Sequence, residues 1–125
     1  MSAEEKLKEL NLELPAAPKP MGVYKPIVIV GNLAHLSGHG PLREDGSLTI
    51  GRVGEDMDVE GGYAAARETG LALLATIRSA LGSLDRVARV VKTLGFVNST
   101  DDFVDQPKVI NGCSDLFAEL YGTET

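Results

Sequence analysis

The chain has 125 residues, a formal net charge of −6 and a sequence pI of about 4.8. This length predicts one domain that can bury a core without disulfides or structural metals. The acidic charge argues against a nucleic-acid partner, because binding phosphates requires clustered Lys and Arg. One small basic cluster occurs, made of Arg78, Arg86, Arg89 and Lys92, and the negative charge of Asp85 within it reduces its net positive charge.

The cysteine count and the N-terminal residues bear on the compartment. Cys113 is the one cysteine, so no internal disulfide can form, which fits a reducing compartment. The first residues, Met-Ser-Ala-Glu-Glu-Lys, lack the basic and apolar regions of a signal peptide. No apolar run approaches the roughly 20 residues needed to cross a bilayer. We therefore expect a cytoplasmic protein with no membrane partner.

Residues 1–20 are expected to form an N-terminal arm. Residues 3–14 favour a turn or two of amphipathic helix, in which Leu7, Leu10 and Leu12 can pack. The prolines between Leu14 and Pro20 impose an extended connector, because proline lacks an N–H donor and keeps the preceding residue out of the helical region. The arm is predicted to lie across a domain formed by residues 21–125.

Four stretches predict strands. Residues 27–30 are a β-branched run, Gly31-Asn32 is a turn signal, and residues 33–37 alternate as the returning strand. Residues 48–50 form a weak third strand at an edge. Residues 86–97 are the longest candidate, and both faces of this stretch are largely apolar, which is typical of a central strand covered on both sides.

Two segments have the periodicity of helices. Apolar side chains recur at spacings of three and four between Asp58 and Gly82, and Asp56 or Asp58 can cap the start. Gly70 in mid-helix predicts a close approach to a sheet, with a merely tolerated glycine as the alternative. A second helix is predicted from Pro107, with its inner face made by Val109, Cys113, Leu116, Phe117 and Leu120. The order of elements predicts an α+β fold, a mixed β-sheet with two helices packed on one face.

Few side chains indicate catalytic chemistry. His35 and His39 are too few for a zinc site, which takes three or four ligands, so neither a metal nor a cofactor is expected. Ser37 lacks a nucleophile elbow, and Cys113 on the apolar helix face is predicted to be an inert thiol. His39, at a strand end, has a functional and a structural interpretation, while position alone favours a structural role for Asn111. No catalytic residue is assigned.

Several spaced segments together resemble the YjgF/RidA family of reactive intermediate deaminases. They are Gly22-Val-Tyr24, Leu36-Ser-Gly38, residues 89–98, Asp102-Phe103 and Val109-Ile-Asn111 with Leu116-Phe117. The Val-Asn-Ser-Thr-x-Asp-Phe and Gln-Pro-Lys-Val-Ile-Asn-Gly stretches are similar to a less characterised subgroup. Each motif is short, and the specificity comes from their common order over residues 14–122.

The resemblance implies a chorismate-mutase-like fold that assembles as a homotrimer with ligand pockets between subunits. It implies hydrolysis of an enamine or imine to a 2-oxo acid and ammonia, without a cofactor. By motif, Tyr24, Ser37 and Gly38 line the substrate pocket, and Asn111 hydrogen-bonds near it. His39 stands where many members carry glutamine, so the polar contact at this position differs from the family pattern.

The resemblance also predicts two further strands after the second helix. One bears an arginine that pairs with the substrate carboxylate, and the other bears a glutamate that holds the attacking water. The sequence ends at Thr125, so neither residue is assigned, Glu124 matches no motif, and we expect a weakened activity. Two alternatives stay open: a non-catalytic module that binds a small carboxylate or acts in regulation, and an endoribonuclease or translation inhibitor, which the acidic charge makes the least favoured.

Overall fold

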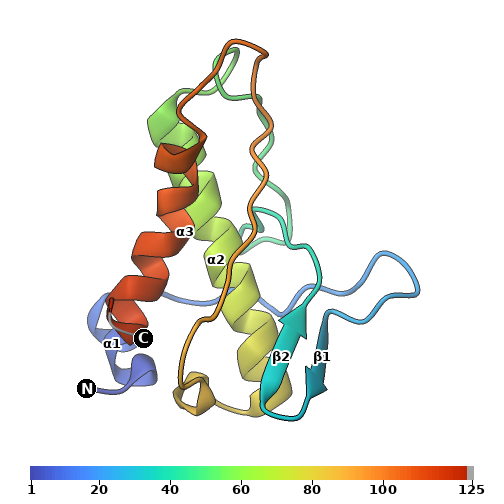
Figure 1. Cartoon of the computed structure of the whole chain (residues 1–125), viewed down its shortest axis with the longest axis vertical. Helices are drawn as coiled ribbons and strands as arrows, with labels where there is room; N and C mark the ends of the chain where they lie inside the picture. Colours follow the sequence, from blue (N-terminus) through green and yellow to red (C-terminus); the bar gives the residue numbers. More distant parts are fainter. Residues whose placement is uncertain (124–125) are drawn as a thin grey trace.

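The computed structural model describes residues 1–123 and places a pair of long helices beside a β-hairpin (Figure 1). The elements are α1 (Ala3–Glu9), β1 (Ile27–Val30), β2 (Leu33–Leu36), α2 (Val59–Leu81), the 3₁₀ turn η1 (Leu84–Arg86) and α3 (Gln106–Tyr121). Helix α3 lies along α2, α1 packs near the C-terminal end of α3, and β1 touches α2. Glu124 and the end of the predicted 21–125 domain lie outside the described residues.

The predicted start and end of α2 and the predicted start of α3 are confirmed. Asp58 caps α2, because its Oδ1 accepts a hydrogen bond from the Gly61 N–H at 2.7 Å. Gly82 ends the helix in the left-handed region, with a φ of 86° that favours glycine. Pro107 occupies the first turn of α3, where its missing N–H costs no helical hydrogen bond. These ends are fixed by local chemistry, which is why the sequence predicts them.

Glycines allow the two long helices to approach each other closely. A Cβ atom at Gly112 of α3 would overlap the main-chain carbonyl of Tyr63 on α2. A Cβ at Gly70 would lie 2.9 Å from Leu116 Cδ2 and 3.3 Å from Cys113 Sγ. The packing role predicted for Gly70 is therefore confirmed, but the surface that it approaches is α3 and not a sheet.

The core is made by the facing sides of the helices and extends to the N-terminal arm. Leu74, Leu84, Leu116 and Leu120 are its largest fully buried side chains. Leu7 of α1 is buried against this group, Leu12 packs partly against it, and Leu10 is exposed. A second group, around Val53, Val109 and Cys113, fills the other end of the helix pair. Arm and domain thus share one apolar core.

The sheet is smaller than the predicted mixed sheet. Strands β1 and β2 pair antiparallel with Ile27 opposite Leu36, and Gly31 takes a φ of 62° in the turn, so the predicted hairpin is confirmed. The predicted strand at residues 48–50 is reduced to one isolated bridge between Leu42 and Leu48. The described residues therefore form a two-stranded antiparallel sheet with three helices, which keeps the α+β class.

The prediction of a central strand at residues 86–97 is wrong for this structure. Its first residue belongs to η1, and residues 88–97 have no strand pairing. Val91, Leu94 and Phe96, expected on buried faces, are 74%, 71% and 88% exposed. A strand forms only where a neighbouring strand completes its hydrogen-bond ladder, and the hairpin pairs with itself alone. The sequence pattern reports the preference for a strand and not the presence of this neighbour.

Candidate functional site

The end of the hairpin holds three of the predicted pocket residues, Ser37, Gly38 and His39. The Ser37 N–H donates to the Pro26 carbonyl at 3.0 Å, which continues the pairing of β1 and β2 by one step. The Ser37 hydroxyl donates to the same carbonyl oxygen at 3.4 Å. Both contacts fix Ser37 at the end of the hairpin, and we call residues 37–39 the rim. Ser37 is partly buried there, while Gly38 is exposed.

Both ring nitrogens of His39 are engaged. Its Nδ1 lies 2.8 Å from the main-chain oxygen of Ser37, and its Nε2 lies 2.7 Å from the Thr76 hydroxyl on α2. A carbonyl oxygen can only accept, so Nδ1 carries the hydrogen. In the neutral imidazole Nε2 is then an acceptor, and Thr76 donates to it. His39 therefore links the hairpin to α2, which favours its structural interpretation over direct contact with a ligand.

Thr76 is a site residue that the sequence reasoning missed. Its side chain is 3% exposed, and it is the one polar side chain among the buried residues of the described chain. A buried hydroxyl without a partner costs about 1–3 kcal/mol, so a threonine on an apolar helix face signals a hydrogen-bond partner elsewhere. The helical periodicity does not give this signal for Thr76, because position 76 lies about 120° around the helix from the predicted inner face of Ala66, Gly70 and Leu74.

The other two predicted pocket residues lie apart from each other. Tyr24 precedes β1 in an irregular segment, is 48% exposed, and its hydroxyl oxygen accepts from the Met21 N–H at 3.3 Å. Asn111 lies on the exposed side of α3. Within residues 1–123, no hydrogen bond joins Asn111 to Tyr24, Ser37 or His39. One chain thus gathers the hairpin residues but not the whole predicted set.

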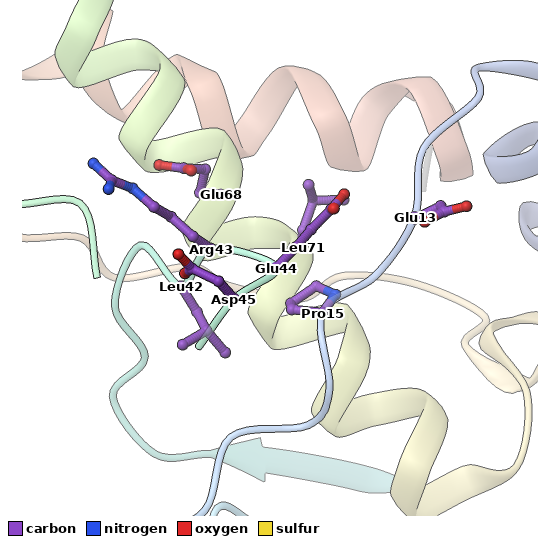
Figure 2. Close-up of a pocket in the computed structure, with 8 residues that line it drawn as sticks. All are labelled: Glu13, Pro15, Leu42, Arg43, Glu44, Asp45, Glu68 and Leu71. Atoms are coloured by element: carbon purple, nitrogen blue, oxygen red, sulfur yellow. The ribbon is translucent and has the colours of Figure 1, made fainter. Parts of the chain in front are cut away.

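A cleft of about 440 Å³ lies between the N-terminal connector, the turn after β2 and the side of α2 (Figure 2). Its lining is Glu13, Pro15, Leu42, Arg43, Glu44, Asp45, Glu68 and Leu71. Arg43 Nε donates to Thr49 Oγ1 at 3.1 Å, and the Thr49 hydroxyl donates to Glu68 Oε1 at 2.6 Å. The lining carries four carboxylates and one guanidinium, so the charge of this cleft opposes a carboxylate ligand. None of the predicted pocket residues lines it.

A smaller cleft of about 170 Å³ lies beside α3. Its lining is Val90, Thr93, Ser114, Phe117, Ala118, Tyr121 and Gly122. The Tyr121 hydroxyl donates to the Leu84 carbonyl at 3.0 Å, and burial raises the pKa of this phenol to about 12. The phenol therefore stays neutral near pH 7 and holds η1 against α3. No predicted pocket residue lines this cleft either.

Comparison with known proteins decides the family. The family model described as "YjgF/chorismate mutase-like, putative endoribonuclease" matches residues 4–125. The chain belongs to the YjgF family. It is 42% identical over 118 residues to the protein TCP17 of Trypanosoma cruzi, which covers 94% of this chain and 74% of that protein. The family resemblance in the sequence is thereby confirmed.

Solved structures confirm the fold of this YjgF protein. A structure described as a putative endoribonuclease from Shewanella oneidensis MR-1 matches with a TM-score of 0.93 and 34% identity, over 98% of this chain and 81% of that chain. An Agrobacterium tumefaciens protein of unknown function matches with a TM-score of 0.85 and 40% identity, over 96% and 73% of the two chains. The chorismate-mutase-like fold implied by the motifs is the fold of this chain.

Metal-ligating and nucleophilic groups are dispersed in this YjgF chain. Within residues 1–123, the His, Cys, Asp and Glu side chains form no group of three or more that could hold a metal ion. Cys113 is buried, and its burial raises the pKa of the thiol to about 11, so the thiolate is scarce near pH 7. None of the helices described is long and apolar enough to cross a bilayer.

Proposed function

We propose that this YjgF protein hydrolyses reactive enamine or imine intermediates to 2-oxo acids and ammonia, in a pocket completed between the subunits of a homotrimer. The observation that carries the proposal is the rim of the hairpin: Ser37 is anchored there, and Tyr24 is half exposed just before β1. Polar groups held in place at an open edge suit a pocket whose second wall comes from another subunit.

The reaction requires orientation and proton transfer and no redox step. An enamine first becomes the imine, as its β-carbon gains a proton and its nitrogen loses one. Water then adds to the carbon of the C=N bond, a proton passes to the nitrogen, and the C–N bond breaks to release ammonia as the C=O bond of the 2-oxo acid forms. The hydroxyls of Ser37 and Tyr24 are suited to hydrogen-bond the substrate during this sequence. In residues 1–123, neither the carboxylate-binding arginine nor the water-holding glutamate of the family is assigned.

The exposed apolar surface supports association of subunits. The segment of residues 88–97, which has no strand pairing, exposes most of Val91, Leu94 and Phe96. The side chains of β1 are about half exposed. An isolated two-stranded hairpin is marginally stable in water, and an unpaired extended segment is a site for pairing with another chain. A neighbouring subunit that covers this surface would remove both problems and would bring a second wall to the hairpin rim.

The test is deaminase activity with the assembly measured in parallel. A dehydratase acting on threonine or serine would generate 2-iminobutanoate or 2-aminoacrylate in the assay, and ammonia release would be followed with and without the protein. We expect faster release, and we expect Tyr24→Phe, which removes one hydroxyl, to lower kcat/KM roughly tenfold. A rate equal to background, with the trimer intact by light scattering, would overturn the proposal.

A non-catalytic role is the second candidate, and one specific observation favours it. Both nitrogens of His39, the one histidine at the rim, are already hydrogen-bonded, so His39 supplies no free acid or base. Binding of 2-oxobutanoate without turnover of the imine would favour this candidate. An endoribonuclease, the activity for which the Shewanella protein is named, is opposed by the net charge of −6.

A further inference from the structure

We propose that His39 and Thr76 are positioning residues for the candidate site: the buried Thr76 hydroxyl orients the His39 ring, and the ring fixes the main chain at Ser37. This inference rests on the proposed function for the identity of the site. It assigns a role to Thr76, a residue of α2 that matches none of the family motifs seen in the sequence.

The hydrogen bonds run in one direction. In the neutral ring the Thr76 hydroxyl donates to Nε2 across 2.7 Å, and the Nδ1–H donates to the Ser37 carbonyl across 2.8 Å. Because the carbonyl cannot donate, the ring is held as the Nδ1–H tautomer. The Ser37 carbonyl is thus held from the interior of the helix pair through the His39 ring, whereas the Ser37 N–H and hydroxyl are held by Pro26.

The hydrogen bond between His39 and Thr76 links the hairpin region to the helices of the described chain. Among the described residues, no other hydrogen bond joins residues 21–40 to a helix. Strand β1 meets α2 through packing, and the hairpin side chains are largely exposed. The direction in which the rim presents Ser37 therefore depends on the contact between His39 and Thr76.

The choice of residues also points to positioning. Thr76 is 3% exposed and lies among Leu74, Ala75 and other apolar side chains of α2. Packing alone would be served as well by valine, which has the same shape without a hydroxyl to satisfy. The buried Thr76 hydroxyl instead contacts the His39 ring, and this ring contacts the rim at Ser37. The hydroxyl therefore helps to specify the geometry of the rim.

The first experiment reads the ring directly and needs no ligand. Long-range ¹H–¹⁵N correlation NMR of the full chain would give the His39 tautomer, and amide hydrogen exchange would follow Ser37, whose N–H is bonded to the Pro26 carbonyl. We expect the Nδ1–H tautomer in the wild type, and faster exchange at the Ser37 amide in Thr76→Val with recovery in Thr76→Ser. An Nε2–H tautomer, or exchange that Thr76→Val leaves unchanged, would overturn the proposal.

The second experiment connects the ring to the site. Thr76→Val is expected to weaken binding of 2-oxobutanoate roughly tenfold, because it removes the hydrogen bond that orients the His39 ring. Thr76→Ser is expected to restore the binding. Thr69→Val is the matched control, because the Thr69 hydroxyl donates to the Ala65 carbonyl within α2. Equal weakening in Thr69→Val would show a general effect on the helix and contradict the positioning role.

The two experiments separate the failure of this inference from the failure of the proposed function. If the wild type does not bind 2-oxobutanoate and releases no ammonia from the imine, the proposed function fails, and the tautomer and amide exchange still decide whether Thr76 positions Ser37. If the wild type binds and Thr76→Val binds equally well, the site stands and the positioning role is overturned.

Discussion

The Glu4 carboxylate holds the Arg78 guanidinium at two points, with 2.6 Å between Oε1 and Nη2 and 3.3 Å between Oε2 and Nε. The same carboxylate accepts from the Leu84 N–H at 2.7 Å. Glu4 belongs to α1, whereas Arg78 lies at the end of α2 and Leu84 begins η1. One side chain thus fastens the N-terminal arm to the junction that follows the long helix.

Replacing Glu4 with glutamine tests this fastening. Glu4→Gln keeps the shape but removes the charge that strengthens each of these hydrogen bonds, so we expect the free energy of unfolding to fall by about 1–2 kcal/mol. Urea unfolding followed by circular dichroism would measure it. Glu9→Gln, an exposed position on the same helix, is the matched control and should change stability by less than about 0.5 kcal/mol. Equal effects of the two substitutions would refute the specific role of Glu4.

The same carboxylate predicts a dependence of stability on pH. The hydrogen bond from Arg78, followed by that from the Leu84 backbone, lowers the pKa of Glu4 below its ordinary value of 4.5, against the opposing effect of burial. Because the pKa of Glu4 is lower in the folded state, this carboxylate contributes to the free energy of unfolding. The contribution is fully present above the ordinary pKa of about 4.5 and is lost as the pH falls through the folded-state pKa. The stability difference between wild type and Glu4→Gln should therefore shrink as the pH falls below about 4.5. A difference that stays constant over this range would contradict the shift.

Close contact of the helices at Gly112 predicts a second loss of stability. In Gly112→Ala the added methyl would overlap the Tyr63 carbonyl, and because that atom is backbone, α2 and α3 must separate. We expect a loss of about 2 kcal/mol or more, within the range of overpacked cores, measured as a shift of the urea midpoint. Ser114→Ala, on the exposed side of the same helix, should leave the midpoint nearly unchanged. An unchanged midpoint for Gly112→Ala would show that the helices can move apart freely.

Features of the fold that depend on local chemistry could be predicted from the sequence. Asp58 and Gly82 mark the ends of α2 because capping and the left-handed turn involve only nearby residues. Gly31 marks the hairpin for the same reason. The apolar face of α3, including Leu116, was also readable, because helical periodicity reports which side is buried.

Features that depend on partners distant in sequence could not be predicted in this way. Phe96 has the pattern of a buried strand residue, yet it is exposed because no strand pairs with its segment among residues 1–123. His39 gave no preference between function and structure until its contact with Thr76, 37 residues later, was known. For the candidate site, motif resemblance placed Tyr24 and Asn111 in one pocket, but within one chain Tyr24 lies in the irregular segment before β1 and Asn111 lies on α3.

The exposure of Phe96 predicts how the subunits associate. The ring is 88% exposed in the single chain, so Phe96→Ser should leave the unfolding of the isolated chain nearly unchanged. If a neighbouring subunit covers this ring, its burial contributes about 2 kcal/mol per contact, and the substitution should raise the dissociation constant of the assembly more than tenfold. Sedimentation velocity over a range of concentrations would measure this. Lys92→Ser, exposed on the same segment, controls for effects on the segment itself. An assembly as tight in Phe96→Ser as in the wild type would show that the subunits meet elsewhere.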